Sequence, residues 1–100
     1  MNVDEIIRVE IDRQGRLCVT PRSGDFDLVY RAAMEVYWDR ERKCLHSPIP
    51  REWTYPMWFR QIVAAVADEF GVRLSLSGET LWVNVPDALR AEMVGTGTAR

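Results

Sequence analysis

A cysteine and the single histidine of the chain lie two residues apart. Cys44 and His46 fall on a predicted strand, where side chains at i and i+2 point to the same face. A Cys–His nucleophile pair, or half of a metal site, requires this geometry. No second thiolate or carboxylate lies at ligand spacing nearby, and Glu35 or Asp39 could orient His46 only in a favourable strand register. We therefore predict no catalytic residue and no metal site, and assign Cys44 and His46 only to the lining of a candidate pocket.

The motifs of the common enzyme classes are absent from the sequence. It contains no GxGxxG, P-loop, GxSxG or HExxH motif. Asp25/Asp27 and Asp68/Glu69 are predicted to be solvated surface acids, because the first pair flanks an aromatic residue and the second lies at a helix end. The two cysteines have no CxxC spacing and are expected to be buried, reduced thiols. We predict a protein that is not an enzyme and has no cofactor.

The chain contains four tryptophans, a residue type enriched in interface hot spots. Trp82 alternates with its apolar strand neighbours, which predicts that it lies on the sheet face away from the helix. Trp58 falls beside the apolar stripe of the predicted helix. Aromatic surface left outside a core favours contact with a partner. We therefore predict an interface for a second subunit or a protein partner at four residues: Trp53, Trp58, Trp82 and Tyr37.

Residues 48–58 place aromatic side chains between prolines, directly before the predicted helix. Trp53 precedes Thr54, the predicted N-cap, and this placement favours a hydrophobic staple against Trp58. The functional alternative is an aromatic-lined groove that binds an extended peptide or a flat ligand. The residues by themselves leave both interpretations open.

Length and charge exclude several classes of protein. One hundred residues allow one domain, predicted at residues 1–94 and followed by a flexible polar tail at residues 95–100. Thirteen basic and fifteen acidic residues give a net charge of −2, which argues against a nucleic-acid partner. No apolar run approaches the ~20 residues that span a bilayer, and the acidic N-terminus does not match a signal peptide. We expect a cytoplasmic protein without a membrane partner.

Alternating side chains predict strands in the first half of the chain. Residues 7–11 and 17–20 form a hairpin around Gly15, with the odd-numbered side chains facing the core. Residues 26–38 fit two periods, and we prefer a strand with a bend near residues 32–33, although residues 26–33 also match a helical face. A further strand follows at residues 44–46.

The period changes after residue 54. Apolar residues at helical spacing predict one long helix at residues 55–70, capped by Thr54 and Gly71. A second hairpin is predicted from residues 72–77 and 80–85, with a short helical turn at residues 87–93. The fold class is therefore α+β: an antiparallel sheet of five to six strands with one long helix packed on one face.

Three stretches of the middle third carry a family resemblance: residues 38–39, 43–48 and 50–59. Their aromatic-rich pattern resembles small α+β proteins of uncertain function encoded by bacterial integron gene cassettes, some of which are similar to toxin-immunity proteins. The resemblance implies a cytoplasmic protein that works by binding, often as an oligomer. It implies no active-site residue.

Two functional hypotheses follow from these patterns. The first is a small protein that acts by protein–protein contact and self-associates through the aromatic residues. The alternative is a small-molecule-binding protein or small enzyme with a pocket between helix and sheet, at whose mouth Cys44 and His46 lie.

Overall fold

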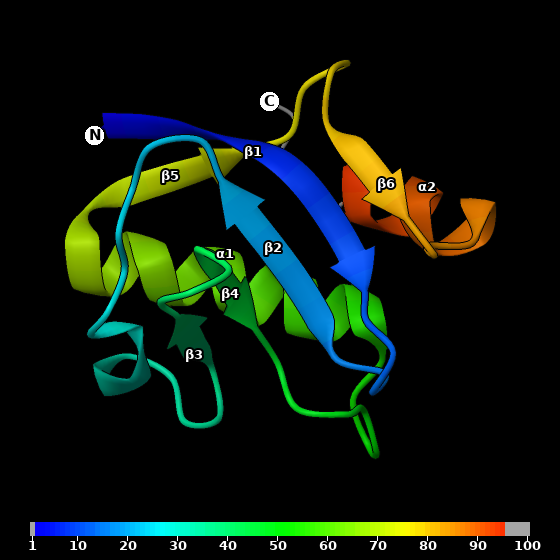
Figure 1. Cartoon of the computed structure of the whole chain (residues 1–100), viewed down its shortest axis with the longest axis horizontal. Coiled ribbons are helices and arrows are strands. Elements are labelled where there is room, and N and C mark those ends of the chain that lie inside the picture. The colour runs from blue at the N-terminus through cyan, green and yellow to red at the C-terminus, as the bar shows by residue number, and fades with distance from the viewer. Residues whose placement is uncertain (1, 96–100) are drawn as a thin grey trace.

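A computed structural model describes residues 2–95, which form a six-stranded sheet packed on a long helix (Figure 1). This confirms the α+β class. The tail predicted at residues 95–100 lies outside the described residues except for Gly95, which ends the last helix. The elements in chain order are β1 (Asn2–Ile11), β2 (Leu17–Pro21), the 3-10 turn η1 (Val29–Arg31), β3 (Tyr37–Asp39), β4 (Cys44–His46), α1 (Tyr55–Phe70), β5 (Val72–Ser75), β6 (Leu81–Val83) and α2 (Asp87–Gly95).

Strand β1 pairs along both of its edges and makes the sheet mixed. On one edge it pairs with β2 in antiparallel orientation. On the other edge β5 runs parallel to its first half and β6 runs parallel to its second half. The prediction of a purely antiparallel sheet is therefore wrong, as is the second hairpin. Both predicted strands exist, but each pairs with β1 instead of with the other.

The first hairpin is confirmed, but the buried residues of β1 are even-numbered before Arg8 and odd-numbered after it. Ile11 lies opposite Leu17, and the turn uses Gly15 at a φ of 87°. A β-bulge between Ile6 and Arg8 then inserts one extra residue into β1. Ile6 is therefore fully buried, while Ile7, predicted for the core, is only partly buried.

Residues 26–38 form a strand only at Tyr37–Asp39, so the preferred long strand is wrong. The segment instead folds as η1 and turns that cover the C-terminal end of α1, with the Phe26 and Phe70 rings 5.0 Å apart. Both the alternating period and the helical period matched this segment, and packing against α1 selected the helical spacing. The residues buried by this packing are Phe26, Val29, Ala33 and Val36.

Helix α1 begins and ends where the sequence predicts. The Thr54 hydroxyl accepts a hydrogen bond from the Met57 amide at 3.3 Å, and Gly71 closes the helix in the left-handed conformation. The Tyr55 hydroxyl donates to the Gly15 carbonyl at 2.8 Å, which ties the helix start to the first hairpin. The buried face of α1 packs against the sheet through Phe59, Ile62 and Val66.

Thr80 holds the loop between β5 and β6 against β1. Its hydroxyl donates to the Ile6 carbonyl at 2.7 Å and accepts from the Ser77 amide at 3.0 Å, and the residue is buried. The substitution Thr80→Val keeps the shape but leaves both backbone groups without this partner. We expect it to lower the free energy of unfolding by about 1–3 kcal/mol in urea denaturation.

Thr20→Val is the matched control, since it makes the same change at a partly buried position of β2. An equal loss in both variants would show that the Thr80 hydroxyl has no special role.

Candidate functional site

A hollow lies between the turn before β3, the segment before α1 and the first turns of α1. Its volume is about 650 Å³. We call it the tryptophan groove. Its lining residues are Met34, Glu35, Pro48, Ile49, Arg51, Glu52, Trp53, Trp58 and Gln61.

Ser47 fixes one wall of the tryptophan groove. It is fully buried, and its hydroxyl accepts from the Leu17 amide at 3.1 Å and donates to the Pro48 carbonyl at 2.8 Å. The Ser47 amide donates to the Leu17 carbonyl at 3.0 Å. These bonds attach the proline-containing segment to the start of β2, so the wall has a defined position.

Trp53 and Trp58 form the staple that the sequence predicts. Their ring centroids lie 4.8 Å apart, one ring before the Thr54 cap and the other in the first turns of α1. Trp58 is 8% exposed and Trp53 is 40% exposed, so Trp58 is part of the packed interior and Trp53 faces solvent. The buried indole N–H of Trp58 has no acceptor among the described residues. The Trp53–Trp58 staple therefore forms part of the lining of the tryptophan groove. The staple and the groove that the sequence suggested as alternatives involve the same residues.

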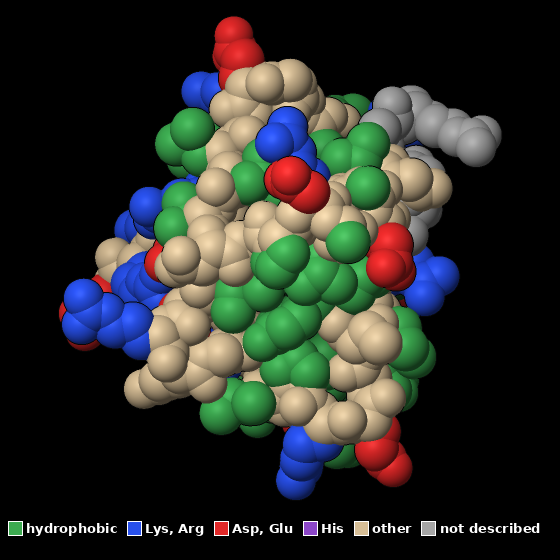
Figure 2. Space-filling view, turned by 90° about the vertical axis from the view of Figure 1, so that its right-hand side faces the viewer, with side chains coloured by type: hydrophobic (Ala, Val, Ile, Leu, Met, Phe, Trp, Pro, Cys, Tyr) green, Lys and Arg blue, Asp and Glu red, His purple; other side chains and the backbone are tan. Residues whose placement is uncertain are grey.

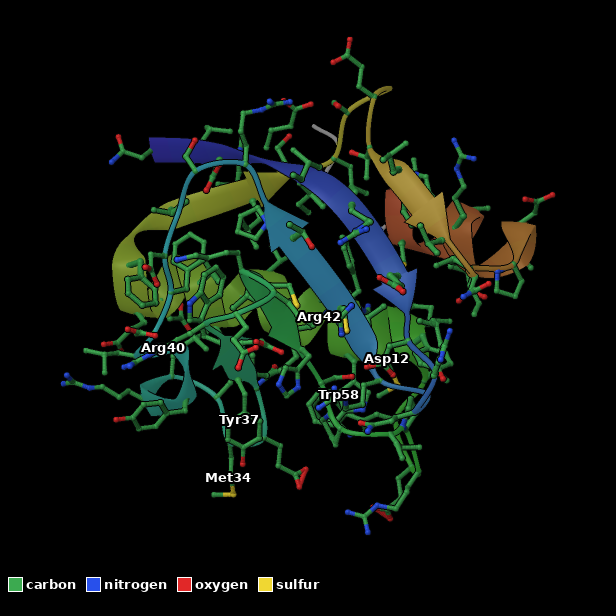
Figure 3. The ribbon with its side chains drawn as sticks, in the orientation of Figure 1. Asp12, Met34, Tyr37, Arg40, Arg42 and Trp58 are labelled. Carbon is green, nitrogen blue, oxygen red and sulfur yellow. The ribbon has the colours of Figure 1, made fainter. Side chains whose placement is uncertain are left out.

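The rim of the groove carries exposed apolar side chains beside its charged ones. Met34 is 86% exposed and points into solvent below β3, as Figure 3 shows. Ile49 and Tyr37 are also exposed, and Tyr37 packs against His46 with ring centroids 5.7 Å apart. Glu35 has a φ of 71°, a conformation that usually favours glycine. The chain therefore keeps a carboxylate on the groove at some cost in backbone energy.

Trp82 does not lie on the open face of the sheet, and that prediction is wrong. Parallel pairing places it beside the fully buried Val9, and its ring packs against the core. The Arg90 guanidinium of α2 lies over the ring at 5.4 Å. Its neighbour Leu81 is exposed instead, and Figure 2 shows hydrophobic side chains gathered on the face that carries β6 and α2.

Cys44 and His46 do not line the pocket predicted between helix and sheet. Neither side chain borders any of the described hollows. Cys44 is buried, as predicted, and its neighbour is Cys18. Cys18 was not predicted as a neighbour of Cys44, because no pattern in the sequence indicates that β2 pairs with β4.

Residues 2–95 contain neither a metal-binding cluster nor a membrane-spanning helix. No group of three or more His, Cys, Asp or Glu side chains in this part of the chain is arranged to hold a metal ion. Its helices are also too short or too polar to cross a membrane.

His46 makes the stability of the fold depend on pH. Burial lowers the pKa of His46, and the nearby Arg16 lowers it further. Below the ordinary value of about 6.5 the unfolded chain therefore binds a proton more readily than the folded chain. We expect the urea midpoint to fall between about pH 7.5 and pH 5.5, and His46→Gln to remove most of that fall because the chain has no other histidine. A His46→Gln variant that keeps the whole pH dependence would assign it to other groups.

Comparison with known proteins identifies the family. The family described as Integron Cassette Protein Hfx_Cass5 matches residues 4–80, which include the whole tryptophan groove. A solved structure described as Integron Cassette Protein Hfx_Cass5, from the mobile metagenome of North West Arm Sewage Outfall, is 50% identical over 93% of this chain and 93% of that chain, with a TM-score of 0.49. No curated protein matches the chain. The integron-cassette resemblance seen in the sequence is confirmed, and the chain belongs to the Hfx_Cass5 family of integron cassette proteins.

Proposed function

We propose that this integron cassette protein acts by protein–protein contact through the tryptophan groove, and that its partner there is a second copy of the chain. The observation that carries the proposal is Met34, which is 86% exposed on the lining of a hollow of about 650 Å³. An apolar side chain of this size in water favours burial against a partner.

The exposed Met34 side chain and the hollow lie on the same surface, so that surface is self-complementary in shape. In a dimer with two-fold symmetry the same patch contacts itself, so each Met34 can enter the groove of the other copy. Trp53 and Ile49 flank this position and are both exposed. Aromatic residues and methionine are the side chains enriched at such interfaces, which supports this use of the rim.

The charged residues of the groove support the same partner. Glu35 and Glu52 carry negative charges, and Arg51 carries a positive one. A patch with both signs can pair with a rotated copy of itself, because each Arg51 meets a carboxylate of the other chain. Such rim charges select the register of the contact more than they add affinity.

The groove is less suited to a small molecule, although its volume falls in the usual range for ligand pockets. Such pockets enclose most of the ligand surface. Here the lining side chains Met34, Ile49 and Trp53 are themselves exposed, so a small ligand would remain largely in solvent. A protein surface covers them more fully.

Sedimentation velocity over a range of concentrations tests the proposal. We expect the wild-type chain to associate, and Met34→Lys to raise the dissociation constant about tenfold or more, since it places a charge in the centre of the contact. The matched control is Leu81→Lys, which adds the same charge at an exposed apolar residue of β6 outside the groove.

These measurements also distinguish the tryptophan groove from the β6 and α2 face as the site of association. A monomeric wild-type chain at all concentrations would overturn self-association. Loss of association in Leu81→Lys but not in Met34→Lys would place the interface on the β6 and α2 face instead of at the tryptophan groove.

A further inference from the structure

The thiols of Cys18 and Cys44 are neighbours on the sheet face opposite α1. In the β2–β4 pair Cys18 lies opposite His46, and Val19 lies opposite Leu45. Side chains alternate along strands, so both cysteines point away from the core residues Val19 and Leu45. Cys18 and Cys44 are 2% and 1% exposed, and Cys44 lies two residues from His46, the residue opposite Cys18, so the two side chains are diagonal neighbours on one face. Two strands far apart in sequence thus bring two reduced thiols together.

Arg42 covers this thiol pair. Its Nη1 lies 3.8 Å from the Cys18 sulfur and 3.7 Å from the Asp12 carboxylate, and its Nη2 donates to Glu10 at 3.2 Å. The Cys18 thiol in turn donates to the Asp12 carboxylate at 3.6 Å. Figure 3 shows Arg42 in front of β2, on the side of the sheet away from α1. The guanidinium is therefore held over the Cys18 sulfur by two ion pairs from the β1 side of the sheet.

The two thiols are chemically unequal. The neighbouring Cys18 side chain lowers the pKa of Cys44 against the opposing effect of burial, and the positive charge of Arg42 lowers it further. The neighbouring Cys44 side chain and burial raise the pKa of Cys18, whose thiol donates a hydrogen bond to the Asp12 carboxylate. A thiolate is the reactive form of cysteine, so Cys44 is the nucleophile of the pair and Cys18 keeps its proton.

We propose that Cys18 and Cys44 are a peroxide-reactive dithiol that closes to an intramolecular disulfide, with Cys44 as the attacking sulfur and Cys18 as the resolving one. This role is separate from the tryptophan groove, since neither cysteine lines it.

The chemistry balances with hydrogen peroxide as the oxidant. The Cys44 thiolate attacks one peroxide oxygen, the O–O bond breaks, and the departing hydroxide takes up the proton that Cys44 has lost, giving water and a sulfenic acid on Cys44. The Cys18 sulfur then attacks the Cys44 sulfur, the S–O bond breaks, and the departing hydroxide takes the Cys18 proton as a second water. The two thiols lose two electrons and the peroxide gains them.

Movement of the Arg42 cover gives the oxidant access. Arg42 lies in the turn between β3 and β4, and its side chain is 36% exposed. The ion pairs of such a side chain are partly screened by solvent and weaken with salt. The short strand β4 adjoins this turn, so the cover and the nucleophile Cys44 lie on one segment.

Peroxide treatment of the folded, wild-type chain tests the proposal. We expect one Cys18–Cys44 disulfide, detected as a mass loss of about 2 Da and as a linked peptide after digestion without reductant. A low-molecular-weight thiol should restore both free thiols. Peptide mapping separates this change from oxygen addition at the exposed Met34. Two thiols that stay free while the chain is folded would overturn the proposal, as would disulfides formed only between chains.

Single cysteine variants test the assignment of roles. With Cys18→Ser the sulfenic acid on Cys44 has no resolving partner, so a dimedone label should accumulate at Cys44. With Cys44→Ser the label should be lost. The reverse result, labelling of Cys18 in Cys44→Ser with an inert Cys44 in Cys18→Ser, would overturn the assignment.

Arg42→Gln tests the influence of the guanidinium separately from its role as a cover. We expect the pH at half-maximal rate of Cys44 oxidation to move upward, because the thiolate loses a nearby positive charge. Arg40→Gln is the matched control in the same turn, where Arg40 pairs with Asp27 and is 79% exposed. An equal shift in both variants, or none in Arg42→Gln, would contradict the assigned influence of Arg42.

Discussion

The pairing of β1 along both edges is the constraint on which the rest of the structure depends. Strand β1 joins the N-terminal hairpin to the two strands that follow the long helix. Without it, α1 would have no continuous sheet on which to bury Phe59 and Ile62. Thr80 and the bulge after Ile6 adapt this strand to two parallel partners that meet it in succession. A single strand therefore sets both the order of the sheet and the face on which the core forms.

The mixed sheet also decides where apolar surface remains. Parallel pairing turns Trp82 toward the core, and the opposite face of β1 carries Arg8 and Glu10 instead of aromatic residues. One exposed apolar surface lies where the turn before β3 meets the segment before α1, and a second lies on the face that carries β6 and α2. The interaction surface that we propose is therefore a corner built from loops on a rigid helix start, a common arrangement for binding residues.

Strand β4 connects the two features to which we assign roles. Its last residue, His46, contacts Tyr37 and precedes the Ser47 anchor of the tryptophan groove. Its first residue, Cys44, faces the charged side of the sheet beside Cys18. One three-residue strand thus supports an apolar surface at one end and a buried thiol pair at the other.

Local patterns in the sequence determined α1 with both of its caps, the first hairpin, the Trp53–Trp58 staple and the burial of both cysteines, because these features depend on residues close together in the chain or on side-chain polarity alone. Only the tertiary structure decided the partners of β5 and β6, the turns at residues 26–36, the inward position of Trp82 and the contact of Cys18 with Cys44. The physical reason is that strands carry the same alternation whichever strand they pair with. Their partners are selected by the packing of distant segments on a shared core, which local periodicity does not encode.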